Sequence, residues 1–499
     1  MRPDFWIIVE NTPLVLLHHD LCAAAFDPKF ASAAPPVYVP EDDAENAKQR
    51  ISNPEQSRLF DPKTERHSFY GSEAEHGLLY LPYPYLVPGG RFNEMYGWDT
   101  AFAVFAWADT HPKIMREQVD NHIYQIRHYG MVLNANRTYY LSRSHPPLIT
   151  PMVLSIWEAA QKRDWADFDP DGLHEDAKSW LACIYDDLEA YYSYWTTGDR
   201  LARDTGLSRY WDDSDAPAPE VTVSEKGHFE HARMHFQTAL ETGMDEEDRK
   251  LFYDDGSKTL TPLYHHANRT MRASGFDPTG HWGYGGLRCM FHAPLCLNAL
   301  LYRMEGDMAK ISEILSRPTA PWRNRQEKRK TAMKEYMHDP ATGLYHDYNF
   351  THGQQVKKPF GNLFHLLWCG LLDDDPETAR KNAGYALDTL ETPHGIAMSN
   401  KTTGSQWDHP YGWPPIQHIA IAGLERCGML KEAERLARKF VDLAAHVHME
   451  RGALYEKYNV IEGNAHFAVV HGYHENVTEH GTFLWTGATL HMARKFLVD

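Results

Sequence analysis

Residues 88–99 bring together side chains that are suited to holding a sugar. The run contains one Arg, two carboxylates and three aromatic rings within twelve residues. Pyranose faces stack on aromatic rings, and ring hydroxyls form paired hydrogen bonds with carboxylates and guanidiniums. The run therefore predicts sugar contacts, although a buried structural Arg–Asp pair on a packed loop is the alternative. The predicted contacts are Arg91, Phe92, Tyr96, Trp98 and Asp99.

Residues 406–417 repeat this composition and lead into a helix through Pro414 and Pro415, which a first helical turn tolerates. Loops that are this rich in Trp, Asp and Gly exceed the needs of a connector and favour a binding role. The predicted sugar contacts here are Gln406, Trp407, Asp408 and Trp413.

Composition narrows the class of ligand. The net charge is −18 and no Lys/Arg-rich run occurs, which argues against nucleic acid and against an anionic membrane surface as partners. The 30 histidines match no strong zinc spacing, so we expect no metal and no cofactor. A small neutral sugar fits best, and the oligomeric state stays open.

No apolar run approaches the ~20 residues that cross a bilayer, and the N-terminal apolar pieces are interrupted, so a cytoplasmic protein is expected.

The elements that carry these loops are expected to be helices. Apolar residues recur with helical spacing at Trp180, Leu181, Ile184, Leu188, Tyr191 and Trp195. Similar stripes predict an all-α protein with one domain over residues 1–499. Residues 1–75 look like an irregular outer strap, and residues 209–227 resemble an acidic inserted loop. Further helices are expected near 114–129, 150–162, 233–243, 258–273, 290–304, 307–316, 323–337, 359–373, 376–391, 416–427 and 433–443.

The two loops resemble the signature motifs of the glycoside hydrolase family 37 trehalases, PGGRFxExYxWDxY and QWDxPxGWxPxQ. The first lacks only the final Tyr and the second is complete. Residues 134–147 are similar to the family stretch NGxRxYYLxRSQPP, which implies sugar contacts from Asn134, Arg143 and His145. The resemblance spans roughly residues 80–490 and implies an (α/α)6 toroid with its pocket at one end.

The resemblance also implies catalytic roles. Residues 274–277 are similar to the acid motif ESGWD and residues 456–458 to the EKY that carries the base. Asp277 would protonate the departing oxygen while Glu456 activates a water on the opposite face, so that the anomeric carbon inverts. Such carboxyl groups stand about 6.5–9.5 Å apart. Alternatives are a turn cap at Asp277, a surface charge at Glu456, a retaining mechanism, and a non-catalytic carbohydrate-binding protein.

Departures from the family pattern fall on the leaving-group side. The acid motif lacks its Glu and a later Arg, the RPESYRED element keeps at best Glu230 of residues 228–233, and the Gly-rich lid has become residues 469–475, with Glu475 reaching the sugar. Changed polar partners indicate a changed leaving group. The sequence therefore predicts hydrolysis of trehalose or glucosylglycerol. Glucosylglycerate is disfavoured because its carboxylate would need an additional Arg.

Overall fold

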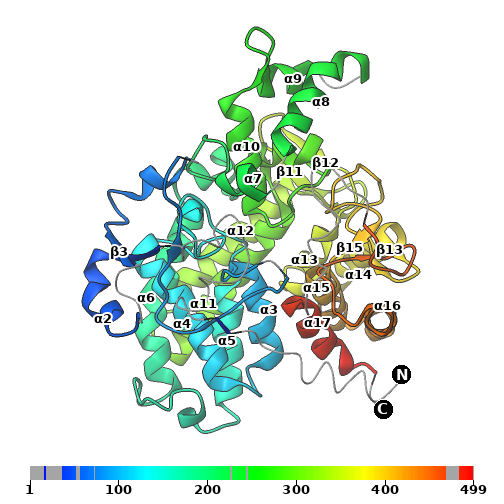
Figure 1. The fold of residues 1–499 in the computed structure, drawn as a ribbon. Coiled ribbons are helices and arrows are strands. Elements are labelled where there is room, and N and C mark those ends of the chain that lie inside the picture. Colours follow the sequence, from blue (N-terminus) through cyan, green and yellow to red (C-terminus); the bar gives the residue numbers. More distant parts are fainter. Residues whose placement is uncertain are drawn as a thin grey trace.

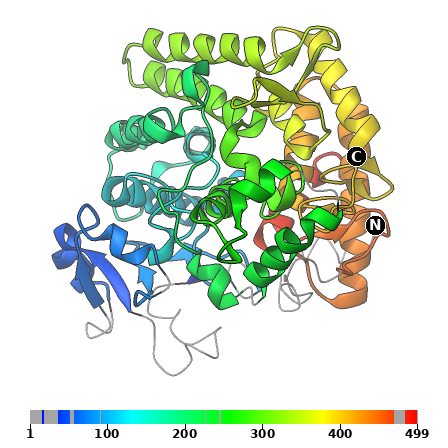
Figure 2. The same cartoon turned by 90° about the horizontal axis from the view of Figure 1, so that it is seen from above.

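The computed structural model describes residues 16–17, 36–51, 57–71, 73–90, 92–224, 227–242, 246–467 and 483–497. Within these ranges six helices form a closed inner ring, in which each helix packs against the next and the last packs against the first. Figures 1 and 2 show this ring from the side and from above. The inner helices are α3 (Gly97–Trp107), α5 (Ile149–Ala160), α11 (Leu295–Ile314), α13 (Phe364–Trp368), α15 (Pro414–Arg426) and α17 (Leu484–Arg494).

A second layer of helices packs outside this ring. Each outer helix follows an inner helix in the chain and contacts it, which makes the inner–outer pairs of an (α/α)6 barrel. The all-α toroid expected from the sequence is therefore confirmed. The outer helices are α4 (Pro112–Tyr129), α6 (Ala177–Trp195), α12 (Ala320–Tyr336), α14 (Pro376–Leu390) and α16 (Leu430–Arg451).

Local sequence signals set the ends of these helices. Asp176 and Ser179 form a reciprocal capping box at the start of α6. Pro414 and Pro415 occupy the first turn of α15, where their missing N–H groups cost nothing. Gly452 ends α16 in the left-handed conformation at φ 74°. Because an outer helix returns the chain after each inner helix, the loops before the inner helices gather at one end of the barrel.

Several predicted elements differ in extent. The two helices expected at 290–304 and 307–316 are the single helix α11, because Glu305 stays helical and forms a buried ion pair with Arg329 at 2.8 Å. The helix expected at 359–373 is α-helical only in α13, after a 3-10 turn at Gly361–Leu363 and before Gly370 at φ 75°.

The segment before the barrel is more regular than an outer strap. Strand β2 (Val37–Pro40) lies between β3 (Ser57–Phe60) and β4 (Leu78–Leu79) in a small parallel sheet. Short helix α2 (Ala44–Lys48) follows β2. The expectation of an irregular segment was wrong for these residues, because strands this short carry too few residues to show an alternating pattern.

An insertion lies between α6 and α11 in the chain, and its helices α8 and α9 are at the top of Figure 1. It consists of α7 (Pro219–Ser224), α8 (His228–Thr242), α9 (Glu246–Phe252) and the hairpin β6 (Tyr253–Asp254) and β7 (Thr259–Leu260). The hairpin explains why the next helix, α10 (Pro262–Ala273), begins later than expected. The insertion packs against α10 through a small apolar cluster, which includes Phe236 and Phe252 from the insertion and Tyr264 from α10. None of the described helices is long and apolar enough to cross a membrane.

Candidate active site

A cluster of aromatic rings occupies the end of the barrel where the predicted loops meet. Trp98, in the first turn of α3, is 3% exposed and lies at its centre. Its ring centroid is 5.9 Å from Phe276, 5.7 Å from Trp407 and 5.9 Å from Trp485. Trp407 stacks on Trp413 at 3.8 Å and 5°. Four segments that are far apart in the sequence therefore converge on one aromatic wall.

The predicted acid, Asp277, follows a glycine that this wall requires. Gly275 has φ 77°, and a Cβ there would lie 3.0 Å from the Trp98 ring. Phe276 packs in the wall, and the side chain of the next residue, Asp277, is 33% exposed. The buried Arg272, on α10, lies 3.5 Å from this carboxyl and donates to Asn268 at 3.1 Å. Arg272 therefore supplies a guanidinium on the leaving-group side, although the acid motif itself lacks its Arg.

Two buried carboxylates accept hydrogen bonds from the loop that begins at Asp277, residues 277–282, which we call the acid loop. Asp408 accepts hydrogen bonds from the Thr279 hydroxyl at 3.0 Å and the Gly280 N–H at 2.6 Å, and also from Thr403. Asp347 accepts from His281 Nε2 at 2.9 Å and Trp282 Nε1 at 2.7 Å. It also binds the backbone N–H of Leu295 and the amide of Asn362, where α11 and the segment before α13 begin.

The role of Asp408 therefore differs from the predicted sugar contact. It is 1% exposed, and its bonds to the acid loop engage both carboxylate oxygens. Burial raises the pKa of Asp408, and the hydrogen bonds from Thr403 and Gly280 oppose that shift. The structure supports Asp408 as a positioning residue for the acid loop.

We expect Asp408→Asn to lower kcat by about 100-fold with little change in KM, because misplacing the acid by about 1 Å has effects of that size. The Asn side chain would present an N–H group to donors that need an acceptor. Steady-state kinetics with a cleaved α-glucoside would measure the change. Thr403→Val is the matched control, since it removes one donor to Asp408 and leaves Thr279 and Gly280 bonded. Equal kcat values for the two variants would contradict the positioning role.

The predicted base, Glu456, is buried at 7% exposure, so the alternative of a surface charge is wrong. Lys457 Nζ lies 3.4 Å from its carboxylate. The indole N–H of Trp485, in the first turn of α17, donates to the Glu456 backbone carbonyl at 2.9 Å. This bond ties the base segment to the aromatic wall.

Asp99 adds a third carboxyl group to this site. It lies in the first turn of α3 and is 5% exposed. Burial raises the pKa of Asp99 well above its ordinary value, and the negative charges of Glu456 and then Asp277 raise it further. The predicted acid and the predicted base therefore both lie close enough to Asp99 to interact with it electrostatically.

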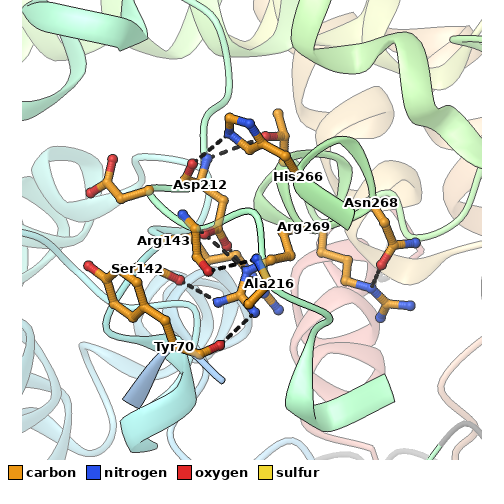
Figure 3. A network of polar contacts seen from close by, with 12 residues as sticks. Tyr70, Ser142, Arg143, Asp212, Ala216, His266, Asn268 and Arg269 are labelled. Carbon is orange, nitrogen blue, oxygen red and sulfur yellow. Dashed lines mark hydrogen bonds and ion pairs between the residues drawn. The ribbon is translucent and has the colours of Figure 1, made fainter. Parts of the chain in front are cut away.

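Arg143 belongs to a buried ionic network that the sequence did not reveal (Figure 3). It contacts Asp212 at 3.4 Å and Glu220 at 2.5 Å, and Asp212 also binds Arg269 at 3.1 Å. Burial alone would raise the pKa of Asp212, but Arg269 and Arg143 outweigh it and lower the pKa. Burial is likewise outweighed at Glu220, where Arg143 and Arg272 lower the pKa. Residues 209–227 are therefore not simply an exposed acidic loop.

The remaining predicted contacts lie around the start of α3. Phe92 and Tyr96 are half-buried and pack edge to face at 5.4 Å. The Gly97 N–H donates to the Asn134 carbonyl at 3.1 Å. His145 Nδ1 accepts the Trp98 N–H at 3.3 Å, which leaves Nε2 to carry the proton of the neutral ring. Burial lowers the pKa of His145 well below its ordinary value, with Arg143 and His122 adding to the effect.

Of the remaining predicted residues, one lies away from this group and two are not among the described residues. Arg91 and Glu475 lie outside the described residues. Glu230 is on α8 with its side chain 57% exposed, and it pairs with Arg233 one turn later. The buried carboxylate that meets Arg143 is instead Glu220, ten residues earlier. Its signal in the sequence is the Pro219-Glu220 pair, which is a better match to the start of RPESYRED. Among the described residues no cluster of His, Cys, Asp and Glu could hold a metal ion.

Comparisons with known proteins identify the family of this chain. The chain matches the family described as Trehalase over residues 27–496. A cytosolic neutral trehalase of Neurospora crassa is 32% identical over 450 residues, covering 83% of this chain and 56% of that protein. A periplasmic trehalase of Pseudomonas aeruginosa is 31% identical, covering 78% and 68%. The structure of neutral trehalase Nth1 from Saccharomyces cerevisiae matches with a TM-score of 0.78 at 27% identity, covering 96% of this chain and 90% of that one. The chain spans about half the length of the cytosolic relatives. It belongs to the trehalase family.

Proposed function

We propose that this protein is an inverting glycoside hydrolase that releases glucose from trehalose or a related small α-glucoside. The observation that carries the proposal is the gathering of Asp277, Glu456 and Asp99, from three distant segments, at one aromatic wall. Aromatic faces bind pyranose rings, and two carboxyl groups suffice for glycoside hydrolysis. A protein that only bound carbohydrate would not require this coupled set of carboxyl groups.

In the proposed reaction Asp277 donates its proton to the glycosidic oxygen as the bond to the anomeric carbon breaks. Glu456 takes a proton from the water that attacks the opposite face, and the product glucose has inverted configuration. Asp99, whose pKa is raised, lies near both groups and is suited to hydrogen bonding a glucose hydroxyl. The half-exposed position of Asp277 leaves room for a leaving group beside Arg272.

The leaving group is the open part of the proposal. The family resemblance favours glucose, and the changed residues around Asp277 favour a smaller group such as glycerol. Arg272 gives a specific reason to consider glycerate as well, because a guanidinium at 3.5 Å from the acid could pair with a carboxylate on the leaving group. Arg272 therefore provides the additional Arg that a glycerate carboxylate would need.

Glucose release from a panel of substrates tests the proposal. The panel contains trehalose, glucosylglycerol, glucosylglycerate, maltose and sucrose, each at several pH values and without added metal. Release from trehalose alone would identify glucose as the leaving group, whereas preference for glucosylglycerol or glucosylglycerate would identify the smaller group. No release from any of them would favour the carbohydrate-binding alternative.

The stereochemistry is tested by NMR during the first turnovers. Inversion of trehalose gives one β-glucose and one α-glucose, because only the attacked carbon inverts. Inversion of glucosylglycerol gives β-glucose alone. Early formation of α-glucose without β-glucose would show retention and would overturn the assignment of Glu456 as a base.

A further inference from the structure

We propose that Lys457 is a positioning residue that keeps the carboxylate of Glu456 ionised and, through Gln406, couples the base segment to the acid loop. This inference rests on the acid and base roles proposed above. It concerns the Lys of the EKY motif, to which the resemblance assigned no role and whose surroundings only the structure shows.

The contacts of Lys457 place its ammonium group between four partners. Nζ lies 2.8 Å from Gln406 Oε1 and 3.4 Å from Glu456 Oε2. The same atom lies 4.9 Å from the centroid of the Trp413 ring and 5.1 Å from that of Phe467. Lys457 is only 6% exposed. A lysine this buried is costly unless its charge is compensated, and here a carboxylate, an amide oxygen and two ring faces compensate it.

Gln406 extends these contacts to the acid. Its side-chain amide N–H donates to the backbone carbonyl of Asp277, while its side-chain oxygen accepts from Lys457. The Gln406 backbone carbonyl accepts from the Trp413 indole N–H at 2.9 Å, which fixes the loop to the aromatic wall. A continuous path of hydrogen bonds therefore runs from the base through Lys457 and Gln406 to the acid. Inversion depends on a fixed gap between those two carboxyl groups, and this path helps to maintain it.

The charge of Lys457 has a separate effect. Glu456 shares an acidic environment with Asp99 on α3 and Asp277 on the acid loop, and both Glu456 and Asp277 raise the pKa of the buried Asp99. Lys457 places a cation 3.4 Å from the Glu456 carboxylate. An opposite charge at this distance favours the ionised carboxylate, which is the form that a general base needs. Lys457 thus offsets the two neighbouring acids.

The test is the pH profile of kcat/KM for Lys457→Met and Lys457→Arg, with whichever panel substrate the wild type cleaves fastest. Met matches the length of Lys and fits between the two rings, but it removes the charge. We expect the acidic limb of the Met variant to move to higher pH by about 1–2 units, because loss of a cation within 4–6 Å changes carboxyl titration by that amount. The plateau should fall by about 10- to 100-fold through lost positioning. The Arg variant should keep the acidic limb of the wild type.

Lys439→Met serves as the matched control, because Lys439 is a paired lysine on the outer helix α16 that contacts Glu391, at the end of α14. Its pH profile should equal that of the wild type. An acidic limb unmoved in Lys457→Met would overturn the proposal even if the variant were slow, since lost packing lowers rates without moving the limb. If the Met variant does not fold, Lys457→Gln is measured in the same way and decides by the same criterion. Full activity of Glu456→Gln would instead overturn the proposed function itself.

Discussion

Asp277→Asn and Glu456→Gln are each expected to lower kcat/KM by about 100- to 10,000-fold while the fold is retained. General acid and general base catalysis each contribute effects of this size. Both substitutions preserve side-chain shape, so the aromatic wall and the contacts of Arg272 and Lys457 can remain. Glucose release at a fixed pH measures the loss, and circular dichroism confirms the fold. Glu462→Gln, six residues from Glu456 and exposed, is the control and should retain activity.

A substrate with a better leaving group separates the two roles. Fluoride departs from α-glucosyl fluoride without protonation, so Asp277→Asn should lose little activity on this substrate. Glu456→Gln should stay inactive on it, because the attacking water still needs a base. Equal losses for the two variants would mean that Asp277 is not the acid, and activity of both on natural glucosides would mean that the catalytic pair lies elsewhere.

Asp212→Asn is expected to destabilise the protein by about 3–5 kcal/mol at pH 7. The substitution leaves Arg143 and Arg269 buried with one carboxylate fewer, and breaking a buried pair in this way has costs of that order. Urea denaturation followed by fluorescence measures the change in the free energy of unfolding. Asp186→Asn is the control, because its pair with Arg317 is largely exposed and should contribute less than about 1 kcal/mol. A change below 1 kcal/mol in Asp212→Asn would contradict the structural importance of this network.

The same network predicts a pH dependence. The pKa values of Asp212 and Glu220 are lowered in the folded protein by their arginine neighbours. The stability from these ion pairs is therefore fully present above the unfolded pKa values of about 3.9 and 4.3, and it is lost as pH falls through the folded values. The difference in stability between the wild type and Asp212→Asn should shrink below about pH 4. A difference that stayed constant down to pH 3 would show that Asp212 does not act through its charge.

Buried polar partners were the part of the site that the motifs could not reveal. Asp212 lies 69 residues from Arg143 in the sequence and 57 from Arg269, so no local pattern links them. An acidic segment is read as solvated unless its partners are known. The opposite holds for Asp408. Its place within a family motif predicted a sugar contact, whereas its two carboxylate oxygens bind the acid loop. The match of residues 228–233 to RPESYRED predicts Glu230 as a sugar contact, and the structure instead pairs Glu230 with Arg233 on an exposed face of α8.

The sequence alone determined the helical class, the inner and outer helices with clear apolar stripes, and the loops that carry the sugar-binding residue types. These features depend on local periodicity, on capping residues and on runs of about twelve residues, which a single sequence displays directly. Only the tertiary structure decided which charges meet: Arg272 with Asp277, Lys457 with Glu456 and Gln406, and Arg143 with Glu220. Such pairings depend on how distant segments are brought together by closure of the helical ring, and burial then makes each paired or unpaired charge energetically important.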